Sequence, residues 1–156
     1  MKKALITIGS TREYIDPVRY ISNESSGKQG MALIKVLLKK KFHIVCLHGY
    51  LQVKPIVSSK IKYIFTPNAK SMLDEAKKNI KVDLAIFNAA VSDYKVKNYS
   101  KQKIKKESDL NIQLRKNPDI LKSICKLKQR PKTIVGFAYE TNDVLSNAKK
   151  KLKNKK

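Results

Sequence analysis

Short apolar segments recur along the chain, and most of them are rich in isoleucine, valine or leucine. They lie at residues 4–8, 43–47, 61–65, 83–91 and 133–139. Apolar runs of this length that do not alternate with polar residues are typical of strands buried on both faces of a parallel sheet. The pattern therefore predicts five strands of a mostly parallel sheet.

Between these segments the apolar residues take a helical spacing. The clearest case lies between the third and fourth strands, at Ala69, Met72, Leu73, Ala76 and Ile80. The same i, i+3, i+4 stripe occurs over residues 31–38 and, beginning near residues 141–142, over Val144, Leu145, Ala148 and Leu152. These spacings predict amphipathic helices that cover the sheet.

A further helix is predicted from its start signal. Asn117, Pro118 and Asp119 are typical of an N-cap, a first helical position and an acidic first turn. Ile120, Leu121, Ile124 and Cys125 would then face the core. Strands that alternate with helices predict one α/β domain over residues 1–156, Rossmann-like and doubly wound with right-handed crossovers.

Two connections are much longer than the usual loop of about 2–6 residues in such a fold. Residues 9–27 follow the first strand, and residues 92–116 follow the fourth. In the second, Leu110, Ile112 and Leu114 alternate with polar residues, which favours an edge strand or an extended, strand-like flap. Because open α/β sheets bind ligands beyond their strand ends, both connections are candidate site segments.

The chain is strongly basic, with 35 Lys plus Arg against 12 Asp plus Glu and a formal charge of +23. Only four of the basic residues are arginine, which indicates general lysine enrichment more than a set of phosphate clamps. The charge permits a basic nucleic-acid-binding module as an alternative. Zinc-ligand spacing and the aromatic doublet of RNA-recognition domains are both absent from the sequence, so we do not expect specific nucleic-acid binding.

The remaining composition favours an intracellular protein. Cys46 and Cys125 lie in apolar segments and are too few for a disulfide framework, so we expect reduced thiols. His43 and His48 lack further ligands at metal-binding spacing. No apolar run approaches the roughly 18 residues of a membrane span, and the first apolar run is too short for a secretory signal. We expect a cytoplasmic protein without a membrane partner.

Three of the five glycines, Gly9, Gly27 and Gly30, lie in the first long connection and at the start of the helix after it. Gly27 follows Ser25 and Ser26 at this helix start, where free backbone N–H groups and the helix dipole favour anions. The spacing fits neither a Walker loop nor a dinucleotide fingerprint. Anion binding and a purely structural Gly-Ser turn both remain open from these residues.

Motifs in one order along the chain carry a resemblance to a known family. They are GSTREYIDPVRYISNESSGKQG at 9–30, NAAVSDY at 88–94, KIKK at 103–106, KNPDIL at 116–121, VGFAYET at 135–141 and a lysine-rich segment at 148–155. Together they closely resemble bacterial phosphopantothenoylcysteine synthetase, also called phosphopantothenate-cysteine ligase. In many bacteria this is the C-terminal domain of the bifunctional DNA/pantothenate metabolism flavoprotein.

The resemblance implies a step of coenzyme A biosynthesis. In the family, CTP activates the carboxylate of 4′-phosphopantothenate as an acyl-cytidylate and pyrophosphate leaves; the amine of cysteine then displaces CMP. Mg²⁺ and lysines offset the charge of the phosphates. The family also implies a homodimer. Flavin is not expected, because the chain begins directly with the first synthetase strand and so resembles a stand-alone form without the decarboxylase domain.

Residue roles carry over by the same resemblance. Asn23 would hold the activated carboxyl group in the cysteine-dependent step, with Arg19 beside it, and Lys103 would act in forming the acyl-cytidylate. Asp93 would lie near the cytosine or Mg²⁺. The substrate phosphate would lie at Ser25, Ser26, Gly27 and Lys28. The nucleotide would contact Gly9, Phe87, Asn88, Ala89, Asp93, Lys103, Pro118, Asp119, Ile120, Leu121, Phe137, Lys151 and Lys155.

Two of these lysines can also be placed by helical spacing. Counted from Val144, Ala148 and Leu152, Lys151 and Lys155 fall on or beside the apolar face of the last helix. Lysines on that face suit a helix end that points toward a triphosphate, and a frayed basic tail is the alternative. Relatives continue beyond this helix with further C-terminal strands, so we expect a shortened chain, and a truncated or inactive family member is the alternative function.

Overall fold

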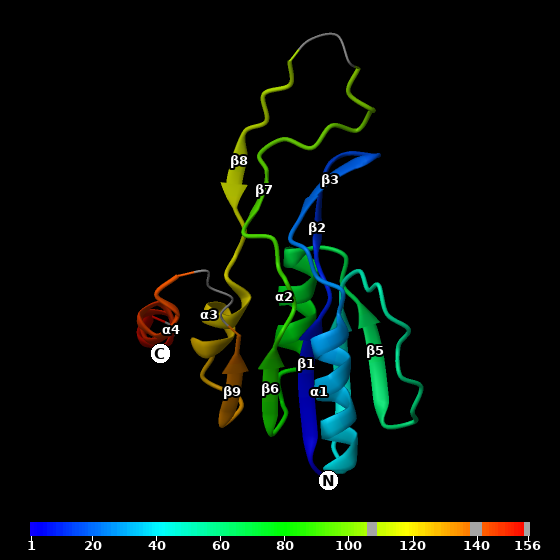
Figure 1. The fold of residues 1–156 in the computed structure, drawn as a ribbon, viewed down its shortest axis with the longest axis vertical. Helices are drawn as coiled ribbons and strands as arrows, with labels where there is room; N and C mark the ends of the chain where they lie inside the picture. The colour runs from blue at the N-terminus through cyan, green and yellow to red at the C-terminus, as the bar shows by residue number, and fades with distance from the viewer. Residues whose placement is uncertain (106–108, 138–141, 155–156) are drawn as a thin grey trace.

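The computed structural model describes residues 1–105, 109–137 and 142–154. Its centre is a sheet of five parallel strands in the order β5-β4-β1-β6-β9 (Figure 1). The strands are β1 (Lys3–Ile8), β4 (His43–His48), β5 (Ile61–Phe65), β6 (Leu84–Phe87) and β9 (Thr133–Gly136). The chain builds outward from β1 on one side and then returns to its other side at β6. This reversal is the position where open α/β sheets bind ligands.

All five predicted strands are present, and two end earlier than expected. β6 stops at Phe87: the Asn88 N–H still donates to the Thr7 carbonyl at 3.1 Å, whereas the Ala89 N–H donates to the Thr7 side-chain oxygen at 3.2 Å. β9 stops at Gly136, and residues 138 and 139 of the predicted strand lie outside the described residues.

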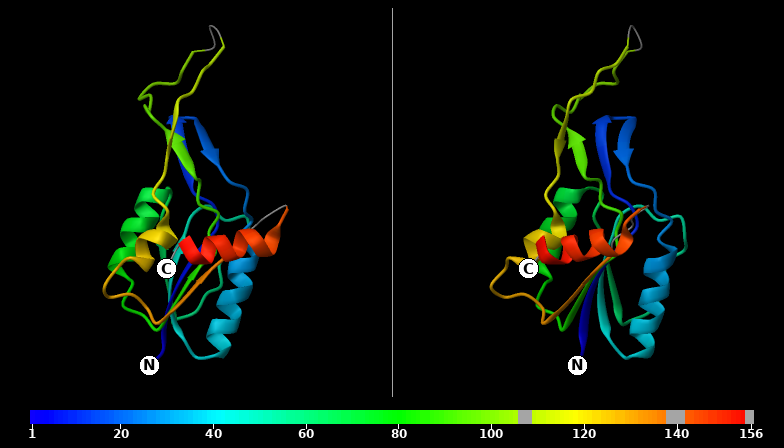
Figure 2. Two further views of the ribbon diagram at one scale, coloured as in Figure 1. Left: turned by 90° about the vertical axis from the view of Figure 1, so that its left-hand side faces the viewer. Right: turned by 60° about the vertical axis from the view of Figure 1, so that its left-hand side comes forward.

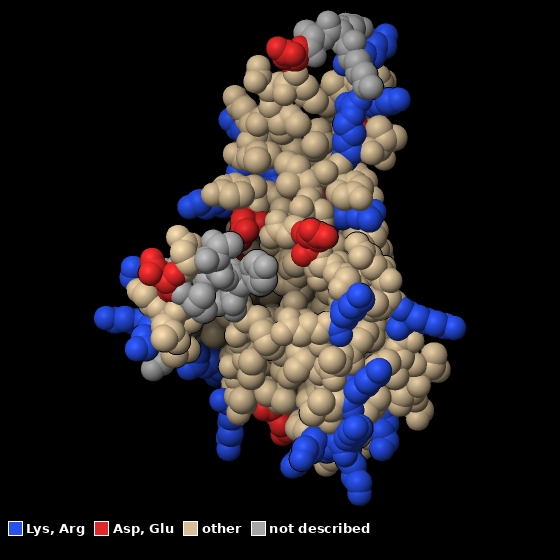
Figure 3. All heavy atoms as spheres, viewed as in Figure 1, with Lys and Arg blue, Asp and Glu red and all other residues tan. Residues whose placement is uncertain are grey.

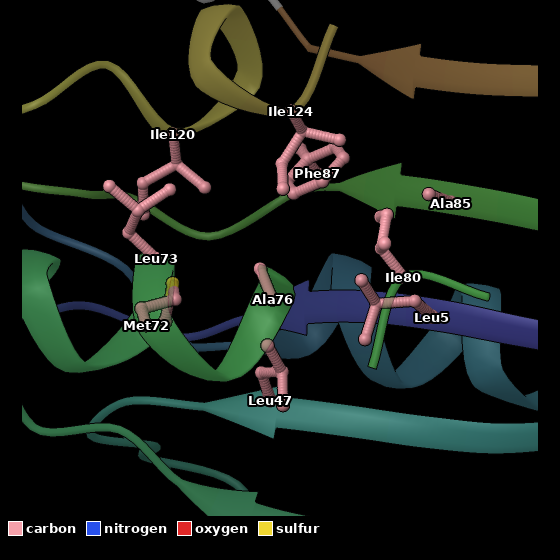
Figure 4. Close-up of a cluster of buried hydrophobic side chains, with 10 residues drawn as sticks. All are labelled: Leu5, Leu47, Met72, Leu73, Ala76, Ile80, Ala85, Phe87, Ile120 and Ile124. Carbon is pink, nitrogen blue, oxygen red and sulfur yellow. The ribbon is translucent and has the colours of Figure 1, made fainter. Parts of the chain in front are cut away.

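The helices cover both faces of the sheet (Figure 2). α1 (Lys28–Lys39) packs on one face, and α2 (Ala69–Lys78) packs with α3 (Ile120–Cys125) on the other. Figure 4 shows the core on the second face, where side chains of β1, β4 and β6 meet those of α2 and α3. Its buried members are Leu5, Leu47, Met72, Leu73, Ala76, Ile80, Ala85, Phe87, Ile120 and Ile124.

The start of α3 differs from the prediction. Asp119 is the N-cap, and its carboxylate accepts a hydrogen bond from the Lys122 N–H at 2.9 Å. Asn117 instead donates from its backbone N–H to the carbonyl of Asp93 at 2.8 Å and from its side chain to the carbonyl of Ser92 at 2.9 Å. The asparagine is therefore engaged by the second long connection, and the helix begins after Pro118.

α4 (Val144–Asn154) runs across the line of α1 in Figure 2. We expected the apolar side of this helix to point inward, and this prediction is wrong for Leu152, whose side chain is 65% exposed. Leu145 of the same helix is 77% exposed. Ala148 is half-buried. Helical spacing identified residues on one side of α4, but among the described residues nothing covers these two leucines.

The two long connections form antiparallel ribbons beyond the carboxyl edge of the sheet (Figure 1). β2 (Arg12–Asp16) pairs with β3 (Arg19–Ser22), a hairpin that the sequence did not predict. β7 (Tyr94–Val96) pairs with β8 (Leu114–Lys116), which confirms an extended flap and not an edge strand of the main sheet. Leu110 and Ile112 precede β8, and both are exposed.

Candidate functional site

A cavity of about 730 Å³ opens at the carboxyl ends of β1 and β6, between α3 and the start of the flap. Figure 3 shows this face hollowed near its middle, with acidic side chains close to the hollow. The predicted nucleotide residues that line the cavity are Phe87, Ala89, Asp93, Pro118, Asp119, Ile120, Leu121 and Phe137. The structure thus brings two segments far apart in sequence, around residues 87–93 and 118–121, to one cavity.

Buried threonines shape the cavity wall. The Thr7 hydroxyl, 1% exposed, accepts from the N–H groups of Asn88 and Ala89. The Thr11 hydroxyl, fully buried, accepts from the N–H of Ser92 at 2.9 Å. These bonds supplement the backbone hydrogen bonds that continue between the two segments after β6 ends, and they fix the path of the chain past the cavity.

Several lining residues were not predicted: Thr7, Val91, Ser92, Tyr94, Lys116, Asn117 and Lys122. Thr7 could have been singled out from the sequence, because it is the one polar residue in the apolar run at 4–8. Asn117 offers a specific feature. Its Oδ1 atom is buried and is the one such side-chain oxygen or nitrogen without a hydrogen-bond partner among the described residues. A ligand N–H donor would satisfy it.

Other predicted nucleotide residues lie outside the lining of the cavity. The Gly9 carbonyl accepts a hydrogen bond from the Ala90 N–H at 2.8 Å, so Gly9 adjoins the segment that lines the cavity. The Asn88 side chain donates to Gln29 Oε1 at 2.9 Å. Lys103 is exposed on the coil after β7. The Lys151 side chain and all of Lys155 lie outside the described residues.

The predicted phosphate segment forms the beginning of α1. Gly27 takes a left-handed conformation, with φ at 80°, and no side chain caps the helix. A Cβ there would lie 2.6 Å from a methyl of Leu51. Ser26 accepts from the Lys28 N–H through its hydroxyl at 3.3 Å, and the first turn contains no acidic residue. Ser25 precedes them in the same segment, so N–H donors and positive charge are available to an anion.

Asn23 is tied to the cavity wall, and Arg19 to the flap. The Asn23 side chain donates to the carbonyl of Val91 at 3.0 Å. The Arg19 guanidinium forms an ion pair with Asp16 at 2.9 Å and donates to the carbonyl of Ile104 at 3.2 Å. The Arg19 side chain therefore contacts the coil that carries Lys103.

Residues 1–105, 109–137 and 142–154 contain no group of three or more His, Cys, Asp and Glu side chains arranged to hold a metal. Asp93 lines the cavity as an exposed carboxylate. Mg²⁺ commonly binds through one or two carboxylates together with substrate phosphates and waters. Asp93 fits a Mg²⁺ ion that arrives with a nucleotide and does not fit a permanent, all-protein metal site.

Cys46 and Cys125 are both free. Burial raises the pKa of the Cys46 thiol to about 12, so this sulfur is inert at neutral pH. None of the helices in the described part of the chain is long and apolar enough to cross a membrane.

Comparison with known proteins places this geometry in context. The family model described as the DNA/pantothenate metabolism flavoprotein C-terminal domain matches residues 1–156. The Coenzyme A biosynthesis bifunctional protein CoaBC of Vibrio vulnificus is 39% identical over 159 residues, which cover 99% of this chain and 39% of that protein. The CoaBC of Haemophilus influenzae is 42% identical over 155 residues, with 96% and 38% covered. The chain thus spans about two fifths of the length of these relatives.

Solved structures share the fold. The crystal structure of the C-terminal domain of CoaBC superimposes with a TM-score of 0.84 at 34% identity, covering 99% of this chain and 72% of that one. A Cab2 variant in complex with phosphopantothenate-cysteine gives a TM-score of 0.79 at 20% identity, with 97% and 69% covered. At that identity the second likeness speaks for the fold alone.

Proposed function

Because this chain belongs to the family of the DNA/pantothenate metabolism flavoprotein C-terminal domain, we propose that it is a phosphopantothenate-cysteine ligase of coenzyme A biosynthesis. The observation that carries the proposal is the single cavity built from the segments around 87–93 and 118–121, to which Asn23 is hydrogen-bonded through Val91. These segments contain the motifs by which the sequence resembles the ligases.

The proposed reaction has two steps. A carboxylate oxygen of 4′-phosphopantothenate attacks the α-phosphorus of CTP, and the P–O bond to pyrophosphate breaks. The amine of cysteine then attacks the acyl carbon, loses a proton, and CMP leaves as the amide forms. Both steps gather negative charge, which Lys103, Lys151 and Lys155 together with Mg²⁺ would offset.

The cavity offers the groups that a bound nucleotide needs. The Phe87 and Phe137 side chains in its lining provide apolar surface for a base, and the orphan Asn117 Oδ1 provides an acceptor for an exocyclic amine. Asp93 would share Mg²⁺ with the phosphates. The beginning of α1, at Ser25 to Lys28, would bind the phosphate of 4′-phosphopantothenate at the same edge of the sheet.

The experiment is a coupled assay for pyrophosphate release with CTP and, separately, with ATP. We expect release with CTP that requires 4′-phosphopantothenate and Mg²⁺, and formation of the amide only when cysteine is added. Asn23→Asp is expected to release pyrophosphate but not to form the amide. Gln129→Glu makes the same amide-to-acid change at an exposed position near the amino-terminal ends of β1 and β6, away from the cavity, and serves as the control.

A protein that is folded by circular dichroism but neither binds CTP nor releases pyrophosphate would contradict the proposal and favour an inactive family member. On the face shown in Figure 3, lysines and arginines are spread over several areas. A basic nucleic-acid module would instead bind DNA with a steep salt dependence, which a salt titration detects.

We also propose a homodimer formed through the flap. Large apolar side chains on and beside β7 and β8 are exposed: Tyr94, Tyr99, Leu110, Ile112 and Leu114. An exposed apolar group of this kind suits burial against a second copy. Sedimentation should show a dimer, and Leu114→Lys should shift it toward the monomer; a monomeric parent chain would refute this assembly.

A further inference from the structure

The side chain of Asp16 is fully buried at the end of β2. Its Oδ1 atom accepts from the backbone N–H groups of Val18 at 2.9 Å and of Arg19 at 2.8 Å. These two bonds close the short turn between β2 and β3, as aspartate often does in turns. One carboxylate oxygen is thus used locally.

The second oxygen, Oδ2, reaches a distant part of the chain. It accepts from Arg19 Nη1 at 2.9 Å and from the backbone N–H of Ile104 at 3.2 Å. Arg19 Nη2 in turn donates to the carbonyl of Ile104 at 3.2 Å. Asp16 and Arg19 of the hairpin therefore bind both the N–H and the carbonyl of Ile104 in the flap.

A third bond extends this attachment. The N–H of Ser100 donates to the carbonyl of Ile15 at 3.0 Å. Figure 1 shows the coil after β7 passing close to the β2–β3 hairpin, in agreement with these bonds. Lys103 is exposed and directly precedes Ile104, so its side chain extends from a segment whose backbone the hairpin holds in place.

Resting on the proposed ligase activity, we propose that Asp16 is a positioning residue that, with Arg19, fixes the backbone of Ile104 and so places Lys103 for acyl-nucleotide formation. A long lysine on an untethered coil would lose rotational freedom each time it met the substrate. Tethering both the N–H and the carbonyl of Ile104 removes part of that cost before the substrate binds.

The charge state of Asp16 is suited to this role. Burial alone raises the pKa of Asp16, but the N–H groups of Val18, Ile104 and Arg19, together with the guanidinium charge, outweigh it and lower the pKa below the ordinary aspartate value. The carboxylate is therefore charged throughout the neutral range.

Asp16→Asn separates the two functions of the side chain. An asparagine with its oxygen at the Oδ1 position still accepts from Val18 and Arg19, while its NH₂ group takes the place of Oδ2 and faces two donors. We expect a fall of about 10- to 100-fold in the kcat of pyrophosphate release, with the KM for cysteine unchanged, since a misplaced catalytic group costs on this order. Asp109→Asn, at an exposed carboxylate of the flap, should leave kcat unchanged.

A double-mutant cycle with Lys103→Ala tests whether the effect passes through the lysine. In the Lys103→Ala background Asp16→Asn should have little further effect on kcat, because no lysine is left to place. An equal fall in both backgrounds, or wild-type kcat in Asp16→Asn alone, would overturn the proposal.

Amide hydrogen exchange gives a readout independent of turnover. In Asp16→Asn the N–H of Ile104 should lose protection while those of Val18 and Arg19 keep it, which also shows that the hairpin remains folded. Unchanged protection at Ile104 would refute the tether even in a protein without measurable activity. If the parent chain does not turn over CTP, the ligase function fails, and this exchange pattern still decides the tether.

Discussion

Thr7→Val is the most direct test of how the cavity wall is built. Valine has almost the same shape as threonine, so the change replaces one hydroxyl by a methyl in a strand that is buried. The hydroxyl accepts from two N–H groups, those of Asn88 and Ala89, both at 3.2 Å. The two donors differ in what remains to them after the substitution.

The Asn88 N–H keeps a partner, because it also donates to the Thr7 carbonyl at 3.1 Å. The Ala89 N–H loses the partner that fixes it and is half-buried. An unpaired buried N–H costs about 1–3 kcal/mol, and the added methyl returns about 0.8 kcal/mol. The free energy of unfolding should therefore fall by about 0.2–2.2 kcal/mol.

Thr66→Val is the matched control. Thr66 is also fully buried, but its hydroxyl donates to the carbonyl of His48, which continues to accept from the Thr66 N–H at 2.8 Å. No group is left unpaired, so the lost hydrogen bond, worth about 0.5–1.5 kcal/mol, is nearly offset by the methyl. This variant should stay within about 0.7 kcal/mol of the parent chain.

Urea unfolding followed by circular dichroism measures both variants, and their m-values show whether the comparison is valid. Thr7→Val should in addition weaken CTP binding several-fold, because it frees the backbone at Ala89 in the cavity wall. Equal stability of the two variants, with unchanged CTP affinity in Thr7→Val, would refute the role of the Thr7 hydroxyl in holding the cavity wall at Ala89.

Two further predictions concern the core. Cys46 should resist a thiol reagent in the native protein at pH 8, while the half-buried Cys125 reacts, so that one thiol is titrated before denaturation and two after it; two native thiols would contradict the burial of Cys46. Gly30→Ala should lower the free energy of unfolding by about 1–3 kcal/mol in a urea titration, because its Cβ would lie 2.3 Å from an isoleucine methyl of β1. Gly136→Ala should lower the free energy of unfolding by less than Gly30→Ala, since the Cβ there would meet the end of a flexible leucine side chain. An equal loss of stability in both variants would show that packing around the new Cβ does not set the difference.

The three central strands, β1, β4 and β6, were predictable because each is an apolar run that a sheet covered on both faces buries. β5 and β9 were also predicted as strands, but burial on both faces is wrong for them, because they form the two edges of the sheet and contain no buried residue. The β2–β3 hairpin was not predictable, because its stability depends on residues elsewhere. The Arg12 guanidinium lies between the rings of Tyr20 and Tyr50, 4.1 Å and 3.6 Å from their centroids. Isolated two-stranded hairpins are marginal in water, and nothing local in the sequence indicates a contact with residue 50.

The candidate site was predictable to the extent that motifs carried it. The resemblance pointed to Phe87, Asp93 and Pro118, which share one cavity. Helical spacing misplaced Leu152, because periodicity shows which residues share a side of a helix and not whether another element covers that side. The motif at 9–30 contains Asp16 but gave it no role, since its bond to Ile104 joins positions 88 apart in the chain.

Long-range hydrogen bonds hold the residues that we propose for catalysis. The first long connection provides Asn23 and Arg19, and each side chain donates to a carbonyl beyond β6, at Val91 and at Ile104. The sheet positions the two connections by placing β1 beside β6, and the connections then position each other. This also separates Lys103 from the many other lysines of a chain with a charge of +23. The residue next to Lys103 is held by a partly buried ion pair. A lysine that adjoins an anchored residue in this way suits the proposed role of meeting a phosphate in a fixed geometry.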